Sequence, residues 1–364
     1  MEYSKFEIMK DRQDIVNLFQ EKPLVHVAAP MVRYSKLQFR TLVRKYGCDL
    51  CFSPMIVADS FVKSIKARDV EFTTNERDSP LSVQFAANNA NDFVDAAELV
   101  APFCDGVDLN CGCPQRWAMK EGFGADLLSK PHIIHDIVRQ LRNRLPQPFA
   151  MSVKMRILSD IRKTVELCRS LDATGVSFLT VHGRTPKQRC EPVDLNALAQ
   201  IQSATSCPIV ANGDVRSLDD AVALHQATGC KGTMSARGLL QNPALFQGHS
   251  RTPLACVQDW IKLCLESEAS FQCFHHHLVF MLEKVLPKHE RHAFNVMRSM
   301  PEVLDFISQY FDISIPERSR IENFSTNIIY KDTSVRDGSY FSSKLLQTND
   351  KFEDYLDSCN LFDE

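Results

Sequence analysis

The chain has 364 residues, of which 44% are hydrophobic and 24% charged, and its mean hydropathy is -0.19. These values are typical of a folded globular protein and argue against an intrinsically disordered chain. The formal net charge is -3 and the isoelectric point about 6.4. Any affinity for a polyanion such as RNA must therefore come from a local basic patch.

No run of about 18 apolar residues is present that could span a bilayer, and the N-terminus does not show the charged and then apolar pattern of a secretory leader. The thirteen cysteines are spread along the chain, which is typical of reduced thiols in the cytosol or nucleus. We therefore expect a soluble protein of the cytoplasm, with the nucleus as the other compartment, and no membrane association. Cys111 and Cys113 lack a second Cys or His pair nearby, so no metal site is expected.

After an N-terminal extension over residues 1–22, residues 23–248 alternate short β-branched runs with longer amphipathic runs, as in repeated βα units around a parallel sheet. The eight predicted strands are Leu24–Ala29, Leu50–Met55, Leu81–Ala86, Gly106–Asn110, Ala150–Arg156, Val176–His182, Pro208–Asn212 and Gly232–Ser235. The predicted helices between them are Ser35–Tyr46, Asn91–Phe103, His132–Arg144, Ile161–Ala173, Asn196–Thr205 and Ser217–Ala227. Eight such units favour an α/β fold of the TIM (β/α)8 barrel type over a doubly wound sheet, which usually has fewer strands.

Beyond residue 248 the pattern changes to helical periodicity without strands. Cys256–Glu268, Cys273–Val285 and Arg291–Met300 are predicted helices of a small C-terminal domain over residues 249–313. Residues 314–364 are polar, rich in Ser, Asn and Asp, and predict a disordered tail.

Unusual residues, many of them polar or ionisable, lie where the predicted strands end, and the active site of a βα barrel forms at the carboxyl ends of its strands. In chain order they are Pro30 and Met31, Gln84, Asn110 to Cys113, Lys154 and Arg156, His182 to Arg184, Asn212 to Asp214, and Ala236 to Gly238. The last two groups follow the seventh and eighth strands, whose loops often bind phosphate, although each could also be an ordinary turn.

Three of these residues allow a functional and a structural interpretation. Lys154 shares one strand face with Arg156; directed inward it implies a bound anion or electron-rich cofactor, and directed outward it would reach water. His182 could be a ligand-facing residue or a core histidine. Cys113 lies in a Gly-Cys-Pro turn beyond the strand end, whereas Cys111 has the character of a small buried hydrophobe.

Seven motifs occur in order along the barrel region. They are Ala29-Pro30-Met31-Val32, Val83-Gln84-Phe85, Asp108-Leu109-Asn110-Cys111-Gly112-Cys113-Pro114, Lys154-Met155-Arg156, Val181-His182-Gly183-Arg184-Thr185, Ala211-Asn212-Gly213-Asp214 and Ala236-Arg237-Gly238. Through them the region from Val25 to Phe246 resembles the tRNA-dihydrouridine synthases. Stretches such as Met31–Lys36, Phe61–Arg68 and Gln115–Lys120 are similar to the tRNA-dihydrouridine synthase 4-like branch.

The resemblance implies a barrel that binds FMN, followed by a helical tRNA-binding domain. It implies that Pro30, Met31 and Val32 line the flavin, that Gln84 and Lys154 contact its ring edge, that His182 lies between flavin and substrate, and that Asn212, Gly213, Asp214, Ala236 and Arg237 hold the ribityl phosphate. Asn110 and Arg184 would bind the substrate, and Cys113 would be the catalytic acid. Ala236 departs from the pattern, because many members of the family have Gly before the Arg.

The implied reaction is reduction of a D-loop uridine of tRNA to dihydrouridine, with NADPH or NADH as reductant and positions 20a and 20b as the sites suggested by analogy. Phosphate contacts are expected from basic side chains, namely Arg116, Lys120, Arg184, Lys187, Arg189, Lys284, Lys288, Arg291 and Arg298. No obligate protein partner is expected. Two alternatives remain open: a flavin enzyme that acts on a free pyrimidine, and a tRNA-binding protein without catalysis.

Overall fold

The centre of the protein is a closed parallel β-barrel. The computed structural model describes residues 13–145, 147–267 and 269–315. Its strands are β1 (Val25–Ala28), β2 (Leu50–Phe52), β3 (Ile56–Val57), β4 (Leu81–Ala86), β5 (Gly106–Cys111), β6 (Ala150–Arg156), β7 (Phe178–His182), β8 (Ile209–Asn212) and β9 (Gly232–Ser235). The pairing β2-β1-β9-β8-β7-β6-β5-β4 closes through β2 and β4, and the short β3 pairs only with β4. The predicted (β/α)8 barrel is confirmed.

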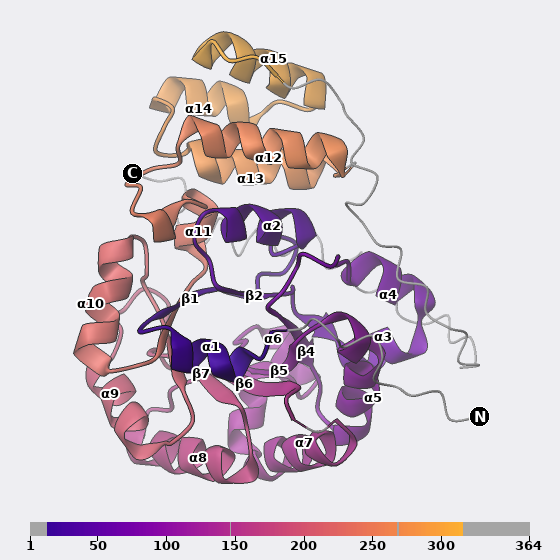
Figure 1. Cartoon of the computed structure of the whole chain (residues 1–364), viewed down its shortest axis with the longest axis vertical. Helices are drawn as coiled ribbons and strands as arrows, with labels where there is room; N and C mark the ends of the chain where they lie inside the picture. The colour runs from indigo at the N-terminus through magenta and orange to yellow at the C-terminus, as the bar shows by residue number, and fades with distance from the viewer. Residues whose placement is uncertain (1–12, 146, 268, 316–364) are drawn as a thin grey trace.

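Helices surround the barrel (Figure 1). They are α1 (Ile15–Glu21), α2 (Leu37–Lys45), α3 (Ala58–Lys63), α4 (Ile65–Glu71), α5 (Ala90–Val100), α6 (Arg116–Lys120), α7 (Pro131–Arg144), α8 (Ile161–Thr174), α9 (Leu195–Ala204), α10 (Leu218–Thr228) and α11 (Arg237–Gln241), with one-turn helices η2 (Ala101–Phe103), η3 (Gly124–Ser129) and η4 (Leu245–Gln247). None of the helices in the described part of the chain is both long and apolar enough for a bilayer crossing.

Alternation along each strand separates two layers of side chains. In β6, Val153 and Met155 belong to the apolar layer between the barrel and its helices. Ser152, Lys154 and Arg156 have the opposite parity and therefore face the barrel axis. The helix that follows β6 begins where the Asp160 carboxylate accepts a hydrogen bond from the backbone N–H of Arg162 (3.1 Å). The sequence thus fixes which residues can reach the interior.

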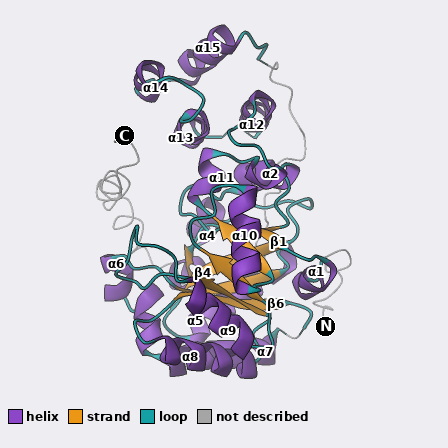
Figure 2. Cartoon of the chain, turned by 90° about the vertical axis from the view of Figure 1, so that its left-hand side faces the viewer, coloured by secondary structure: helices purple, strands orange, loops and turns teal. Residues whose placement is uncertain are grey.

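Helix α1 closes the amino-terminal end of the barrel. Ile15 and Phe19 join the inner apolar cluster, and the rings of Phe19 and Phe178 lie 5.2 Å apart. Figure 1 shows α1 lying across the barrel, and Figure 2 shows α1 and α6 at opposite ends of it. Residues 13–22, expected to precede the barrel as an extension, therefore contribute to its core. The opposite end, where the strands finish, remains for the site.

A helical region follows the barrel, as expected. It contains α12 (Leu254–Glu266), α13 (Phe271–Leu282), α14 (Lys288–Asn295) and α15 (Met300–Phe311), and it lies beside α2 and α11 in both views (Figures 1 and 2). The single predicted helix Arg291–Met300 is wrong, because α14 ends at Asn295 and α15 begins at Met300. Pro301 has no N–H and fits only the first turn of a helix, and Ser299 caps that turn.

The helical region is attached to the barrel by a buried histidine. His277 on α13 is fully buried, and its Nε2 lies 3.1 Å from the backbone oxygen of Tyr34 in the loop after β1. Its ring also stacks on Phe39 of α2 at 4.6 Å. The exact domain boundaries stay a prediction, and the tail predicted over residues 314–364 lies outside the described residues except for its first two positions.

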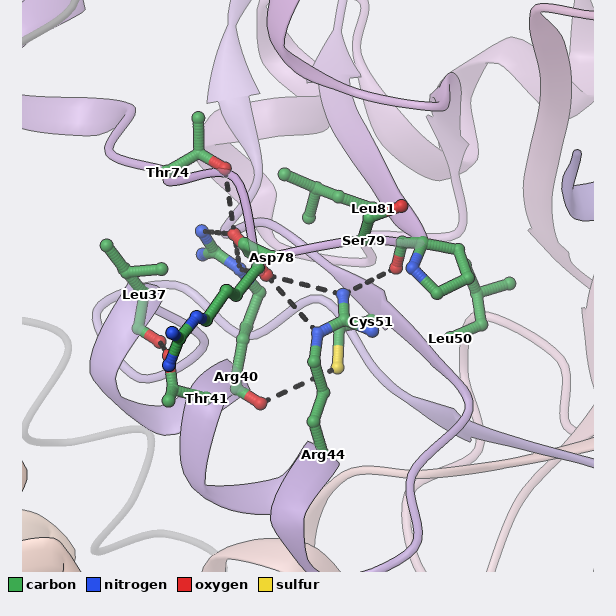
Figure 3. Close-up of polar contacts among 12 residues, drawn as sticks. Leu37, Arg40, Thr41, Arg44, Leu50, Cys51, Thr74, Asp78, Ser79 and Leu81 are labelled. Atoms are coloured by element: carbon green, nitrogen blue, oxygen red, sulfur yellow. Dashed lines mark hydrogen bonds and ion pairs between the residues drawn. The ribbon is translucent and has the colours of Figure 1, made fainter. Parts of the chain in front are cut away.

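A buried ionic cluster joins α2 to the loop before β4. Arg40 donates to the Asp78 carboxylate at 2.6 and 3.0 Å, and Arg44 contacts the same group at 3.3 Å. Thr74 donates a further bond of 3.0 Å, and Figure 3 shows these groups directed at Asp78. Burial alone would raise the pKa of Asp78, but Arg40 and Arg44 together hold it below its usual value.

Candidate active site

The polar residues expected at the strand ends do converge. The strand register pairs Gln84 with Asp108, Asn110 with Lys154, and His182 with both Arg156 and Asn212. Paired residues of a parallel sheet point to the same face, and here that face is the barrel interior. Adjacent strands therefore bring these side chains together inside the barrel mouth.

A chain of hydrogen bonds runs through the interior toward the barrel mouth, from Ser152 on β6 to the turn after β5. The Ser152 hydroxyl donates to Asp108 Oδ1 (2.6 Å), and Gln84 Nε2 donates to Asp108 Oδ2 (2.7 Å). Asn110 Nδ2 in turn donates to Gln84 Oε1 (2.8 Å). Asn110 Oδ1 accepts from the backbone N–H groups of Gly112 (3.2 Å) and Cys113 (3.0 Å). Both amide side chains thus have a defined orientation.

Burial shifts the pKa of two ionisable groups in the interior: Asp108, which belongs to this chain of hydrogen bonds, and Lys154 beside it. The pKa of Asp108 rises to about 6, because burial outweighs the bonds from Ser152 and Gln84 and the charge of Lys154. Burial also lowers the pKa of Lys154 to about 8, and the charge of Arg156 acts in the same direction. Lys154 Nζ donates to Asn212 Oδ1 at 3.0 Å. A buried lysine held by an amide favours a nearby anion or electron-rich group.

Two buried polar atoms next to Lys154 have no hydrogen-bond partner among the described residues. They are Thr180 Oγ1 and His182 Nε2, both on inward positions of β7. Burial, followed by the charges of Lys154 and Arg156, lowers the pKa of His182 to about 2, so the imidazole is neutral. Buried polar atoms are normally satisfied, and unsatisfied ones at a barrel mouth are what a bound ligand would complete.

Cys113 lies in a braced turn at the mouth. Arg156 Nε donates to the Gly112 carbonyl (3.1 Å), and Arg156 Nη1 donates to the Thr185 carbonyl (3.1 Å) in the loop after β7. Burial raises the pKa of the Cys113 thiol, although Arg156 and Lys154 act in the opposite direction. The thiol is therefore protonated at neutral pH, and the same two cations would stabilise the thiolate once the proton has left.

The loops after β7 and β8 are joined by an ion pair. Arg184, buried to 2% exposure, binds the Asp214 carboxylate and the Glu191 carbonyl oxygen. Gly213 has φ +138°, and a Cβ there would lie 2.6 Å from Val193, so the backbone approaches its neighbour as only glycine allows. Arg237, after β9, is exposed. The substrate contact expected of Arg184 stays a prediction. The partners that Arg184 has in the structure give it a role in joining the loops after β7 and β8.

The loop after β1 is held by its own side chains. The Ser35 hydroxyl accepts from the Met31 backbone N–H (3.0 Å), and the Ser35 backbone N–H donates to the Met31 carbonyl (3.0 Å). Pro30 and Met31 are half-buried, and Val32 is 38% exposed. The loop thus presents apolar side chains at the mouth. Among the described residues no group of three or more His, Cys, Asp or Glu side chains could hold a metal ion.

Comparison with known proteins identifies the family. The model of the family described as Dihydrouridine synthase (Dus) matches residues 27–324, which include the barrel from the middle of β1 onward and the helical region. The chain belongs to the dihydrouridine synthase family. The motifs that carried the resemblance lie within the matched range.

Within the dihydrouridine synthases the chain is most similar to one branch. It is 54% identical to the tRNA-dihydrouridine(20a/20b) synthase-like protein of Mus musculus over 82% of this chain and 93% of that protein. Identity to the human protein of the same name is 52%, over 83% of this chain and 96% of that protein. A rat relative named for positions 16/17 is 34% identical over 73% of this chain and 61% of that protein. The predicted branch is confirmed.

The structure adds residues that had no expected role. Asp108, Ser152 and Thr180 face the interior with the predicted site residues. Asp108 stands within a family motif, two positions before Asn110 and hence on the same strand face. The two-residue spacing from Asn110 could therefore have indicated from the sequence that Asp108 faces the site. Ser152 and Thr180 carried no such signal, because small hydroxyl side chains are common in strands and only their neighbours make them informative.

Proposed function

We propose that this protein reduces uridine in the D-loop of tRNA to 5,6-dihydrouridine, with FMN as its cofactor and NADPH or NADH as reductant. The observation that carries the proposal is the protonated Cys113 thiol at the mouth of a barrel whose interior holds Lys154, His182 and a chain of oriented amides. The names of the curated relatives support the reaction and suggest positions 20a and 20b. We also propose that the protein acts in the cytoplasm, with the nucleus as the other compartment.

The residues present fit a flavin. The buried Lys154 ammonium suits the pyrimidine side of the ring system, where negative charge collects on reduction, and Thr180 and His182 each offer a buried atom that needs a partner. Gln84 on β4 is buried in the interior, and Pro30, Met31 and Val32 offer apolar contact from the first loop. Asn212, Gly213, Asp214, Ala236 and Arg237 stand on the neighbouring strands β8 and β9, or in their loops, where backbone N–H groups and the Arg237 guanidinium suit the phosphate. When bound and reduced by NAD(P)H, the flavin supplies two electrons and one hydrogen to carbon 6 of the uracil.

Cys113 supplies the second hydrogen in this proposal. Addition at carbon 6 leaves negative charge on the ring, and protonation at carbon 5 completes the reduction. The Cys113 sulfur gives up its proton, and Arg156 and Lys154 stabilise the thiolate. Asn110 is held at the mouth by Gln84 and by the Cys113 turn, so it can orient the uracil edge. The uridine must leave the RNA stack to reach this depth.

Exposed basic side chains near the mouth suit the RNA backbone. Arg116 and Lys120 on α6, and Lys187 and Arg189 after β7, are exposed, as are Lys284, Lys288 and Arg298 in the helical region, while Arg291 is half-buried. Phosphate contacts of this kind give affinity that falls as salt rises. The free-pyrimidine alternative would use none of these residues. Mapping dihydrouridine in tRNA from cells that lack the protein identifies the target uridine.

The direct test is Cys113→Ala, with Cys273→Ala on α13 as the matched loss of a thiol outside the mouth. We expect the Cys113→Ala protein to remain yellow and to accept electrons from NADPH, but to form dihydrouridine on tRNA at least about 100-fold more slowly, the usual effect of removing a general acid. Cys273→Ala should keep the wild-type rate. Undiminished dihydrouridine formation by Cys113→Ala would remove Cys113 from the mechanism.

A further inference from the structure

Helix α6 carries an exposed tryptophan at the barrel mouth. The chain has two tryptophans: Trp260 is fully buried in the helical region, whereas Trp117 is 37% exposed. Trp117 follows Cys113 by four residues, so their Cα atoms are at most about 15 Å apart. Figure 2 shows α6 at the end of the barrel opposite α1. The exposed ring therefore stands at the open end, near the proposed acid.

The segment that carries Trp117 is fixed to the Cys113 turn. The Ala125 N–H donates to the Cys113 carbonyl (2.9 Å), and the Phe123 N–H donates to the Ala118 carbonyl (2.8 Å). Ala118 is fully buried. A Cβ at Gly124, the first residue of η3, would lie 2.5 Å from the Cys113 carbonyl oxygen, and Gly124 has φ +63°, so η3 approaches the turn as closely as only glycine permits. Trp117 thus has a defined position relative to the thiol.

The indole is oriented but only partly covered. Its Nε1–H donates to the Gln115 side chain, which satisfies the one polar atom of the ring. No aromatic ring of the described residues stacks on Trp117, whereas Trp260 lies 4.5 Å from the His277 ring. A tryptophan that is held in place and left partly exposed is typical of a recognition residue rather than a core residue.

The charges around Trp117 favour a nucleic acid as the occupant. Arg116 and Lys120 flank it on the same helix, and both are exposed. Cations beside an aromatic ring suit a nucleotide strand, whose phosphates meet the cations while a base stacks on the ring. An apolar protein partner would leave both cations without a counter-charge.

Turning one uridine out of the RNA stack leaves its neighbouring base without a stacking partner. We propose that Trp117 stacks on a base adjacent to the uridine that is reduced, and so replaces the partner that this base has lost. The inference rests on the proposed function and deepens it, because it names a residue that recognises the target region of the tRNA.

Tryptophan fluorescence tests the proposal directly. The full chain with its flavin bound is titrated with an unmodified tRNA transcript, and emission is corrected for light absorbed by the RNA. We expect quenching in the wild-type protein and almost none in Trp117→Phe, in which only the buried Trp260 remains. Because a stacked base contributes about 1–3 kcal/mol, and 1.4 kcal/mol corresponds to about 10-fold, Trp117→Ala should raise KM for tRNA by about 5-fold or more.

The same variants separate recognition from a structural role. Trp117→Phe should keep most of the affinity, since a phenyl ring also stacks. Met119→Ala, which removes a side chain of equal exposure from the same helix, should change KM less than about twofold. In Trp117→Ala, kcat at saturating tRNA and the rate of flavin reduction by NADPH should stay near wild type.

Several results would overturn the inference: quenching that persists in Trp117→Phe, an unchanged KM in Trp117→Ala, or a Trp117→Ala protein that loses flavin reduction as well. The last result would mean that Trp117 supports the Cys113 turn. Failure of the proposed function is distinct from these, because a wild-type protein that forms no dihydrouridine on any tRNA would refute the reaction whatever the fluorescence showed.

Discussion

Asp78 and Asp108 are both buried carboxylates, but only Asp78 forms hydrogen bonds with cationic side chains. Arg40 and Arg44 converge on Asp78 outside the barrel (Figure 3), and its pKa lies below the ordinary value. Asp108, inside the barrel, is held by the neutral donors Ser152 and Gln84, and burial raises its pKa to about 6. Similar burial therefore has opposite consequences for the two groups.

The difference separates a residue that stabilises the fold from one that serves the site. Around Asp78 the charge is matched locally, which ties α2 to the loop before β4. Around Asp108 the charge is left incompletely matched, next to a lysine whose pKa is also shifted. Perturbed ionisable groups of this kind cluster where a protein binds or transforms a ligand. Substitutions around both carboxylates test this contrast.

The largest effect is expected from Arg40→Met. It removes the cation closest to Asp78 and also two bonds to backbone carbonyls. Breaking one half of a buried ion pair costs about 3–5 kcal/mol, so the free energy of unfolding in urea should fall by about that amount. Lys45→Met, which breaks an exposed pair with Asp259, is the control and should cost under about 1 kcal/mol. Equal losses would mean that burial does not distinguish the two pairs.

A pH-dependent effect is expected from Asp108→Asn. Because the folded pKa of Asp108 is raised to about 6, stability is fully present below about pH 4 and is lost as pH rises through about 6. The amide cannot ionise, so the unfolding free energy of Asp108→Asn relative to wild type should increase by about 2 kcal/mol from about pH 4 to about pH 8.

Asp78→Asn should behave in the opposite way. The lowered pKa of Asp78 contributes stability that is present above its unfolded pKa and lost as pH falls through the folded value. This variant should therefore be less stable than wild type at neutral pH, with a difference that shrinks in acid. Parallel pH slopes for the two variants would contradict the comparison.

The smallest effects are expected from removing one hydroxyl at each carboxylate. Thr74→Val and Ser152→Ala should each cost about 1 kcal/mol, the net value of one hydrogen bond. Ser152→Ala should also raise the pKa of Asp108, which then keeps only the bond from Gln84. The pH at which Asp108 ionises and stability is lost should therefore move to a higher value. Thr74 is one of the groups that lower the pKa of Asp78, but the two arginines lower it more, so Thr74→Val should shift the pH dependence less than Ser152→Ala does. Equal pH shifts in the two variants would show that the two arginines at Asp78 do not reduce the effect of losing a hydroxyl group.

Much of the site could be predicted from sequence because the barrel converts strand order into position. Once eight βα units are recognised, the residues at the strand ends must gather at one mouth. Alternation within β6 also predicted that Lys154 and Arg156 share a face. The sequence predicted one helix over Arg291–Met300, whereas the structure has the end of α14 and the start of α15 there. Periodicity does not reveal where a helix stops, although Ser299 and Pro301 mark the start of α15.

Local pattern by itself therefore determined the eight barrel strands but not the short β3, together with the order of the motifs and the end of the barrel where chemistry could occur, since period and parity are properties of neighbouring residues. Only the tertiary structure decided that α1 closes one end of the barrel and that Arg184 pairs with Asp214. It also decided that Asp78 is bonded to cations while Asp108 is not, and that Trp117 is exposed while Trp260 is buried. These outcomes depend on contacts between residues far apart in the chain. Burial and charge matching arise from such contacts, and no short stretch of sequence contains them.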